Sequence, residues 1–460
     1  MERNHRRRYL PLLIRFFLVW LVYVVVCVTI PPLFHKSCLH KSMFYEQQRI
    51  GQERVLSIDN NKEALLWRLR LIEEAKERII LCTFDFRDDN SGFDMMAALF
   101  HAADRGVDVQ IMVDGINGML YLTGSRNFRE LAAHENVQVK LYNPVNLLVP
   151  WRANYRMHDK YLIADNFAYI LGGRNTDDLF LGEYKDSYNE DRDILVYEVV
   201  PGEGTSYMQL TEYFEQIWNL PCAKPYEKYI HSGGGLEEHY YAVRKMYPEV
   251  FTEINWEEMT METGGIELCW NPMQPVNKQP QLWDRLVDEM ERGEDILIQT
   301  PYIICNRKMY HDLTDIAGSA EVEMIINAVE SGTNPFGCTD YLNQKKNVRR
   351  TGIHTYEYLG RQALHTKTIL VDEHISIVGS CNLDMRSIYL DTEMMLVIDC
   401  EELNASIRSQ AEILKASSRH IFPDGMAVDG EYYRALEQGL LKKLFYGVLR
   451  VLIIPFRHLL

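Results

Sequence analysis

The chain has 460 residues, of which 47% are hydrophobic and 25% charged, a composition typical of globular proteins. This length predicts two or three compact domains. The formal net charge of −16 argues against binding along a nucleic-acid backbone, so no nucleic-acid partner is expected. The nine cysteines form no C-x-x-C pair, and we expect neither a metal site nor a dithiol redox motif.

An apolar stretch lies near the N-terminus. Residues 16–34 carry no charge, and together with residues 9–14 they are long enough to cross about 30 Å of hydrocarbon. We expect an uncleaved anchor, with a signal peptide or a buried core helix as the alternatives; no small-x-small cleavage pattern follows the stretch. Basic residues flank it on both sides, so the side of the membrane that carries the main body stays open.

The chain also ends in an apolar segment, residues 440–460. Its apolar side chains recur at helical spacing, and Lys442, Lys443 and Arg450 lie off that stripe. The pattern fits a cationic helix in the headgroup layer of a membrane, or a closing helix packed on the core.

Two segments of the chain, residues 156–175 and 363–382, repeat one pattern. Each contains His-x-Lys-x-x-x-x-Asp, followed ten residues after the Asp by Asn. The offset between the copies is 207 residues at all four positions. The two sets are His158, Lys160, Asp165, Asn175 and His365, Lys367, Asp372, Asn382.

The surroundings of the two segments match as well, since strands alternate with helices around both. This predicts a duplicated α/β domain built on mixed sheets, with a pseudo-two-fold axis. The expected divisions are a tail and anchor (1–48), a first domain (49–220), a helical connection (221–270), a second domain (271–420) and a C-terminal segment (421–460).

Each motif is expected to gather its polar side chains at one end of a β-hairpin. The His and the Lys are two residues apart on a strand, so they share a face. A hairpin turning at residues 166–167 places Asn175 opposite His158, and one turning at 373–374 places Asn382 opposite His365.

A His, a Lys and an Asn at one spot suit a phosphodiester. Lysine and asparagine donate hydrogen bonds to non-bridging oxygens, and histidine attacks phosphorus or transfers a proton near neutral pH. Two such sets place one histidine on each side of the phosphorus. One attacks in line to give a phosphohistidine, and the other protonates the leaving alkoxide.

These residues resemble the phospholipase D superfamily, and most closely the bacterial cardiolipin synthases. The resemblance rests on the paired motifs, on Gly172-Gly-Arg-Asn175 and on Gly379-Ser-Cys-Asn-Leu-Asp. It implies two phospholipase D-like α/β sandwich domains with pseudo-two-fold symmetry behind one N-terminal transmembrane helix. It also implies a bacterial cell membrane location and a reaction that needs no cofactor.

The resemblance assigns roles to the motif residues. His158 is expected to be the nucleophile and His365 the general acid and base, with the lysines and asparagines holding the phosphate. Asp165 and Asp372 are expected to order the hairpins and polarise the site. Four further residues are weighed: Arg174 and Arg386 as contacts for an anionic headgroup or as partners of nearby aspartates, and Asp193 and Glu393 as groups that orient a histidine.

The expected function is a membrane-bound phosphatidyltransferase that makes cardiolipin from phosphatidylglycerol and a second phospholipid, with phosphatidylethanolamine as another candidate donor. A phospholipase D-type hydrolase, a superfamily nuclease and a non-catalytic membrane scaffold are the alternatives. Trp151 and Tyr155, just before the first motif, could line a lipid entrance. An accessory protein is not indicated by any motif.

Overall fold

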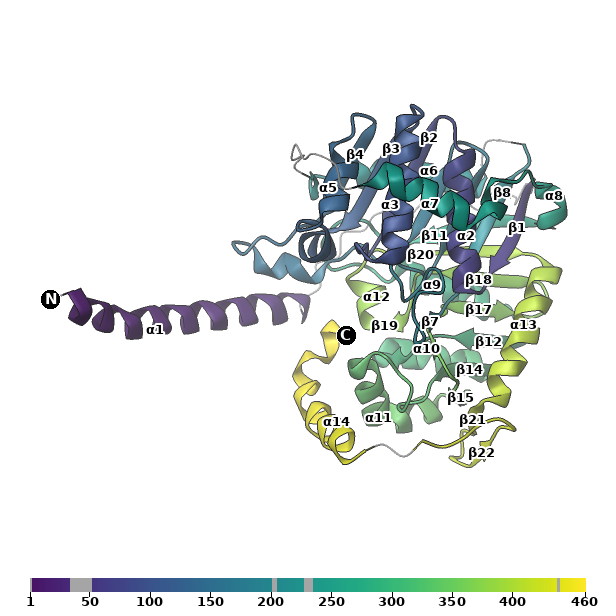
Figure 1. Cartoon of the computed structure of the whole chain (residues 1–460). Coiled ribbons are helices and arrows are strands. Elements are labelled where there is room, and N and C mark those ends of the chain that lie inside the picture. Colours follow the sequence, from purple (N-terminus) through teal and green to yellow (C-terminus); the bar gives the residue numbers. More distant parts are fainter. Residues whose placement is uncertain (1, 34–51, 201–204, 227–234, 437–438) are drawn as a thin grey trace.

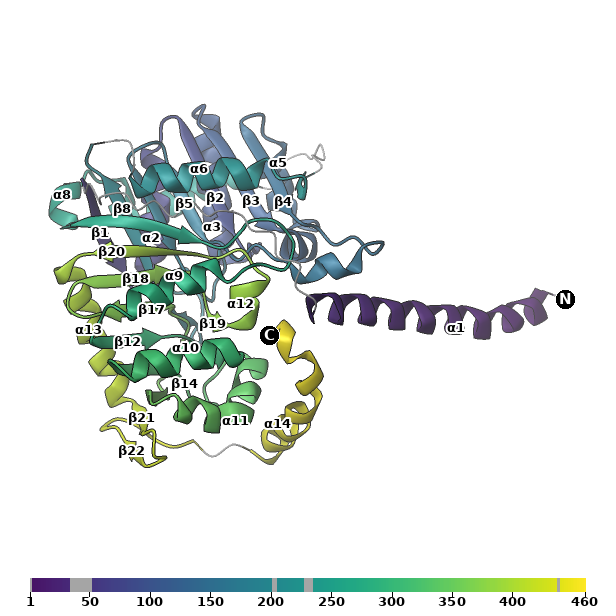
Figure 2. The ribbon, with the colours of Figure 1, turned by 180° about the vertical axis from the view of Figure 1, so that it is seen from behind.

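The computed structural model describes residues 2–33, 52–200, 205–226, 235–436 and 439–460, with side chains from residue 14 onward. Two β-sheets stack to form the body, and one long helix, α1 (Glu2–Thr29), projects from it (Figure 1). Seen from behind, α6 lies across the first sheet and α9 and α10 lie over the second (Figure 2).

The first sheet has nine strands among the described residues. Its central strands β2, β3 and β4 run parallel, and the remaining neighbours pair antiparallel. In spatial order the strands are β10 (Met261–Glu262), β1 (Glu53–Ile58), β8 (Asp193–Glu198), β6 (Ala168–Gly172), β5 (Tyr161–Ala164), β2 (Arg78–Thr83), β3 (Asp108–Asp114), β4 (Val137–Tyr142) and β9 (Ala223–Pro225).

The second sheet, also of nine described strands, repeats this plan with β12, β14 and β15 as its parallel centre. Its order is β11 (Gly265–Trp270), β20 (Met394–Asp399), β18 (Ile375–Gly379), β17 (Thr368–Val371), β12 (Asp295–Gln299), β14 (Glu321–Asn327), β15 (His354–Tyr358), β21 (Ser418–Ile421) and β22 (Ala427–Asp429). The order β1-β8-β6-β5-β2-β3-β4 therefore corresponds to β11-β20-β18-β17-β12-β14-β15. The duplicated α/β architecture expected from the sequence is confirmed.

Two short parallel ladders complete the strand pairing. One joins β7 (Asn189–Glu190) of the first half to β16 (Ala363–Leu364) of the second. The other joins β13 (Ile303–Ile304) to β19 (Leu383–Asp384). The β7–β16 ladder connects the two halves directly beside the second motif.

Helices cover both faces of the sheets, and α6 and α13 contribute to the core that the two sheets share. Several helices begin at side-chain caps such as Asp89 and Asn306, whose oxygens accept N–H groups of the first turn. The α-helices of the body are α2 (Asn61–Glu74), α3 (Asn90–Asp104), α4 (Gly115–Asn117), α5 (Arg126–Ala133), α6 (Ser206–Trp218), α7 (Leu236–Met246), α8 (Trp256–Met259), α9 (Gln281–Met290), α10 (Arg307–Ala317), α11 (Pro335–Arg350), α12 (Met385–Tyr389), α13 (Glu401–Ala416) and α14 (Leu440–Leu452). Shorter helical turns are η1 (Pro31–Leu33), η2 (Gly118–Leu122), η3 (Pro150–Asn154), η4 (Pro248–Phe251) and η5 (Ile454–Leu459).

Three apolar cores hold the layers together. The first lies between the first sheet and helices α2, α3, α5 and α7, and the third lies between the second sheet and α9, α10 and α11. The remaining core includes residues from the inner faces of both sheets, among them Leu171, Val196, Val378 and Leu396. Because the sheets share this core, the two halves pack as one body.

α1 carries the one apolar window long enough to cross a membrane within the described residues, Ile14–Leu33. Only 6% of that window is buried inside the protein. The alternative of a buried core helix is therefore wrong, because the apolar side chains of this helix face away from the body.

The outer stripe of α14 is also exposed. Leu441, Leu444, Phe445 and Val448 face away from the protein, whereas Tyr446 is buried against α11. The alternative of a closing helix that buries its apolar stripe in the core is therefore wrong for these residues.

Candidate active site

Both motifs lie at equivalent places, on the chain that leads into the hairpins β5–β6 and β17–β18. The observed register differs by one residue from the expected one, because Tyr161 pairs with Leu171 and Thr368 pairs with Val378. Each turn uses three residues instead of two, and its first residue, Asp165 or Asp372, has a positive φ of 47° or 48°. The extra turn residue shifts the returning strand by one position in both halves.

Each of the two candidate catalytic histidines forms a backbone hydrogen bond with the opposite half of the protein. The backbone N–H of His158 donates to Thr392 O at 3.2 Å, and that of His365 donates to Glu190 O at 2.6 Å. The chain before each histidine thus runs beside the segment that precedes β20 or β8 of the other half. This exchange brings both motifs to the junction between the sheets.

The side chains of the two histidines also contact the opposite half. His158 Nδ1 lies 2.8 Å from Glu393 Oε1, and His365 Nδ1 lies 2.5 Å from Asp191 Oδ2. At His158, donation from Nδ1 to Glu393 leaves the Nε2 lone pair for the reaction. At His365, the ionised Asp191 accepts from Nδ1, and Lys367 Nζ lies 2.5 Å from the same Nδ1 and 3.3 Å from Nε2. The expected orienting role of Glu393 thus has a matching contact.

Asp193 does not orient a histidine, which corrects the expectation for this residue. Its carboxylate instead lies 2.9 Å from Arg68 Nη2 and 3.3 Å from Arg174 Nη1. Strand pairing explains the error: Gly172 pairs with Asp193, and Gly379 pairs with Met395, so the counterpart of Glu393 is Asp191. Alignment by strand position, at an offset of 202 residues, would have found Asp191.

Both motif lysines are buried beside the histidines. Lys160 is 1% exposed and its Nζ donates to His158 O at 2.5 Å. Lys367 is 2% exposed, donates to His365 O, and lies 3.4 Å from Asp191 Oδ2. Burial lowers the pKa of both lysines, that of Lys160 to about 7. Each lysine charge also affects the histidine pKa in the other half, so the four groups form one electrostatic cluster.

Burial also sets the charge state of the histidines and their carboxylates. It lowers the pKa of His365 to about 4 and that of His158 well below its usual value, so both imidazoles are neutral at pH 7 without substrate. Burial raises the pKa of Glu393 to about 7. Burial also acts to raise the pKa of Asp191, but the attraction of Lys367 and His365 outweighs this effect and holds the pKa below its usual range. The two halves therefore differ in charge: Asp191 stays ionised while Glu393 titrates near neutrality.

The two asparagines have unsatisfied amide groups. The Oδ1 atoms of Asn175 and Asn382 are buried without a hydrogen-bond partner among the described residues. An amide can turn to exchange its oxygen and nitrogen, so each could present its NH₂ group to an anion. A non-bridging phosphate oxygen is the kind of group that would satisfy them.

Arg174 has a structural place, which corrects the expectation of headgroup contact. It is 1% exposed, and its guanidinium donates to Ile58 O at 2.8 Å and to Asn61 Oδ1 at 3.2 Å, besides its ion pair with Asp193. Its aspartate partner is Asp193 on β8, and not Asp177 or Asp178, which lie close to it in the sequence.

Arg386 joins the second half to η3 of the first half and to the C-terminal segment. It pairs with Asp391 at 3.0 Å and donates to Asn154 O at 2.6 Å and to Leu459 O at 3.0 Å. These partners use most of its donors, although the side chain remains 29% exposed. Arg386 therefore connects α12 to η3 and to the C-terminal segment.

Asp165 and Asp372 order the hairpins but lie at the wrong end to polarise the site. Asp165 accepts from the N–H groups of Lys76, Glu77 and Arg78, each at 2.8 Å. Asp372 accepts from Glu294 and Asp295 at 2.8 and 3.0 Å. These contacts fix the turns at the ends of β5 and β17 that are remote from the histidines.

A third buried lysine near the site was not found from the sequence. Lys278 is 3% exposed, and its Nζ has no hydrogen-bond partner among the described residues. Burial lowers its pKa to about 8, against the attraction of Asp391, Asp159 and Glu393. It lies outside both motifs, before α9, and no spacing pattern marks it.

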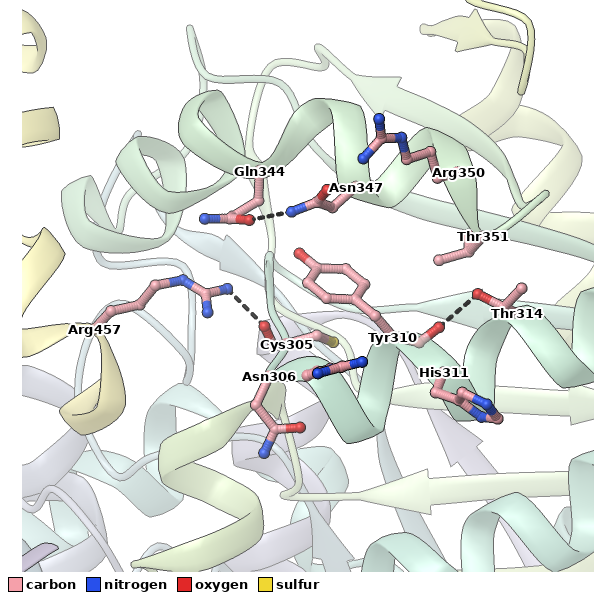
Figure 3. A pocket seen from close by; sticks show the side chains of 11 residues that line it. Cys305, Asn306, Tyr310, His311, Thr314, Gln344, Asn347, Arg350, Thr351 and Arg457 are labelled. Atoms are coloured by element: carbon pink, nitrogen blue, oxygen red, sulfur yellow. Dashed lines mark hydrogen bonds between the residues drawn. The ribbon is translucent and has the colours of Figure 1, made fainter. Parts of the chain in front are cut away.

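A separate cavity of about 420 Å³ lies between α10 and α11 (Figure 3). Arg307, Arg350 and His311 line it, and Arg457 reaches it from the C-terminal segment. None of the motif residues lines this cavity, so it is distinct from the candidate active site.

Comparison with known proteins agrees with this geometry. A family model described as "Cardiolipin synthase, PLD-like domain" matches residues 69–218 and 286–414, which is more than half of the chain. The chain belongs to this family of the phospholipase D superfamily. The two matched segments coincide with the two halves of the duplicated fold.

The relatives extend over most of the chain. Cardiolipin synthase C of Escherichia coli is 24% identical over 408 residues, 77% of this chain and 83% of the relative. An uncharacterised protein of Helicobacter pylori is 24% identical over 434 residues, 84% of this chain and 83% of the relative. The crystal structure of phosphatidylserine synthase from Haemophilus influenzae matches with a TM-score of 0.61 at 14% identity, over 88% of this chain and 95% of that chain, which shows the shared fold. Together with the family match, the relatives support a phospholipid-modifying enzyme.

Proposed function

We propose that this protein is a cardiolipin synthase, a phosphatidyltransferase that joins phosphatidylglycerol to a second phospholipid. One observation carries the proposal: two His-Lys pairs lie close together between the halves, and each imidazole is held through Nδ1 by a carboxylate of the other half. Two imidazoles, each held by a carboxylate and flanked by a buried lysine, supply what phosphodiester exchange needs: a nucleophile, a proton carrier and charge neutralisation.

In the first step, His158 Nε2 attacks the phosphorus of phosphatidylglycerol and forms the P–N bond. The anionic phosphate, once bound, favours the protonated form of His365, which gives this proton to the leaving glycerol oxygen as the P–O bond to glycerol breaks. Lys160, Lys367, Asn175 and Asn382 hold the non-bridging oxygens in this proposal. The products are phosphatidyl-histidine and free glycerol.

In the second step, the neutral His365 takes the proton from a hydroxyl group of the second phospholipid. The resulting alkoxide attacks the phosphorus, the P–N bond breaks, and cardiolipin leaves with His158 restored. The ionised Asp191 beside His365 supports this assignment, because a negative partner stabilises the protonated imidazole that the first step requires. Glu393, whose pKa is about 7, suits a histidine that stays neutral before attack.

The proposal places the enzyme at a membrane. The exposed apolar window of α1 would anchor it, and phospholipids would be both donor and acceptor. Phosphatidylethanolamine is an alternative donor, with ethanolamine as the leaving group. Hydrolysis shares the first step and differs only in that water reaches phosphatidyl-histidine before the second lipid.

The test is a lipid product assay on the full-length protein in vesicles of phosphatidylglycerol and phosphatidylethanolamine with excess chelator, followed by mass spectrometry. We expect cardiolipin and free glycerol from the wild type and neither from His158→Ala or His365→Ala. His311→Ala is the matched control, because His311 is an exposed histidine on α10 that pairs with Asp315.

Other outcomes of the assay would change the assignment. Free ethanolamine instead of glycerol would identify phosphatidylethanolamine as donor. Phosphatidic acid as the sole lipid product would make the enzyme a hydrolase. An absence of lipid product together with cleavage of plasmid DNA in chelator would indicate the nuclease, and an absence of both would favour the scaffold.

A further inference from the structure

The C-terminal segment, α14 with η5, has two sides of opposite character. Lys442, Tyr446 and Arg450, one helical turn apart from each other, face the body: Lys442 Nζ donates to Glu330 O, before α11, at 3.0 Å, and Arg450 Nε donates to Asn343 Oδ1 of α11 at 2.8 Å. Tyr446 is buried beside them. These contacts attach the helix by this side, so its opposite side cannot turn inward.

The opposite side of the C-terminal segment is strongly apolar and exposed. Leu441 is 83% exposed, and the other exposed apolar side chains of the segment are Leu440, Leu444, Phe445, Val448, Val451, Leu452, Ile454 and Phe456. Contiguous apolar surfaces of this kind on soluble proteins mark a surface that something else covers.

The end of α1 lies against this segment. His458 Nε2 lies 2.8 Å from Thr29 O, and Asn154 Nδ2 donates to Val28 O at 2.6 Å. Both contacts fall inside the apolar window that ends at Leu33, four or five residues before its end. When this window crosses a bilayer, η5 therefore lies at the level of the membrane surface.

A second apolar projection lies close to the end of α1, next to η3. Leu147 and Leu148, in the segment between β4 and η3, are exposed, Leu148 by 82%, and Trp151 follows at the start of η3. In both ribbon views α14 and the C-terminus lie on the side of the body from which α1 projects (Figures 1 and 2). Contacts between α1 and η3 place the Leu147–Leu148 segment on this side as well.

The charge of residues 440–460 also favours a membrane as the partner of this face. These residues contain no Asp or Glu, in a chain whose formal net charge is −16. Arg457 is paired with Asp340 at 2.6 Å. Lys442 and Arg450 donate to uncharged groups, and these two with Lys443 keep the helix cationic. A cationic helix with one broad apolar face is typical of segments that lie in the headgroup layer of an anionic membrane.

We infer that α14 and η5, together with the Leu147–Leu148 segment, form a docking face that lies in the surface of the same bilayer that α1 enters. The inference rests on the membrane location in the proposed function. It adds that three segments near α1, namely α14, η5 and the Leu147–Leu148 segment, hold the body against the membrane surface. Because Asn154 is four residues before His158, this face brings the candidate active site to the lipid surface.

The test uses full-length protein with His158→Ala, so that lipid is not turned over, in vesicles of phosphatidylglycerol and phosphatidylethanolamine. A fraction of the phosphatidylglycerol carries a diazirine in its acyl chain, and photolabelled peptides are mapped by mass spectrometry. We expect labelling of residues 440–456 and 145–152 besides α1. Adding Leu441→Gln with Val448→Gln should lower labelling of the C-terminal peptides about fivefold.

The matched control adds Ile413→Gln with Met246→Gln, two exposed apolar residues on α13 and α7 outside the docking face. These substitutions should leave the C-terminal labelling unchanged. Labelled α1 peptides together with unlabelled 440–456 peptides would overturn the inference. Unlabelled 440–456 peptides in a protein that sediments as a dimer would assign the face to a second copy instead.

The readout is independent of the reaction. The expected labelling of the His158→Ala protein, together with no lipid product from the wild type, would refute the proposed function and leave the docking face intact. A protein that makes cardiolipin but shows no labelling of α14 would do the reverse.

Discussion

Glu393 in the second half lies 2.8 Å from Nδ1 of His158 in the first half, and the converse pair of His365 with Asp191 crosses the junction in the other direction. Each half therefore completes the site of the other. A single half contains a histidine and a lysine but lacks the carboxylate that fixes the imidazole, which explains why the site requires both copies of the repeat.

Substitution of these carboxylates should lower activity without unfolding the protein. We expect Asp191→Asn to reduce kcat on the order of 10²-fold, because an amide does not stabilise a protonated imidazole as a carboxylate does. Glu393→Gln should cost less below pH 7 than above it, since the pKa of Glu393 is about 7 and its carboxyl group is already neutral at acidic pH. The measurement is a pH profile of kcat for both variants.

The control for these two variants is Asp315→Asn, which removes the carboxylate from an exposed His–Asp pair at 2.7 Å. It should leave kcat unchanged. Equal pH profiles for Asp191→Asn and Glu393→Gln would contradict the difference in charge between the halves.

A substrate with a good leaving group separates the roles of the two histidines. With phosphatidyl-p-nitrophenol, the departing phenolate needs no proton, so His365→Ala should still release a burst of p-nitrophenol. His158→Ala should release none, because the nucleophile is missing. Stopped-flow absorbance measures the burst, and a burst from His158→Ala alone would exchange the two assignments.

The alkaline limb of the pH profile should report Lys160. Its pKa is about 7, so it is charged below that pH and neutral above it, and kcat/KM should fall as the pH rises through 7. Lys160→Arg keeps the charge, and the fall should disappear even if the rate is lower. Lys346→Arg, at an exposed position on α11, is the control and should retain the wild-type profile.

Arg174 provides a test of a structural role against substrate contact. Removing its charge in Arg174→Met leaves the buried Asp193 with one partner less, and we expect a loss of stability of up to about 3–5 kcal/mol. Thermal unfolding should therefore shift to clearly lower temperature. A raised KM for phospholipid with an unchanged unfolding temperature would instead place Arg174 in contact with substrate.

Much of the architecture could be predicted because it is repeated in the chain. The 207-residue offset, the alternation of strands and helices and the apolar N-terminal window indicated two equivalent α/β units and a candidate membrane helix. The hairpin register was wrong by one residue in both halves for the same reason. Asp165 and Asp372 take a left-handed conformation that adds a third residue to each turn, and the letters Asp-Asn and Asp-Glu do not distinguish the two lengths.

The sequence by itself determined which groups are available for chemistry, because the type and spacing of His, Lys and Asn are local properties of each strand. Only the tertiary structure decided which carboxylate serves which histidine, since that depends on the exchange of segments between halves. It also decided that Arg174 is enclosed while the stripe of α14 is exposed. Burial and long-range pairing are properties of the packed chain, and residues far apart in the sequence set them.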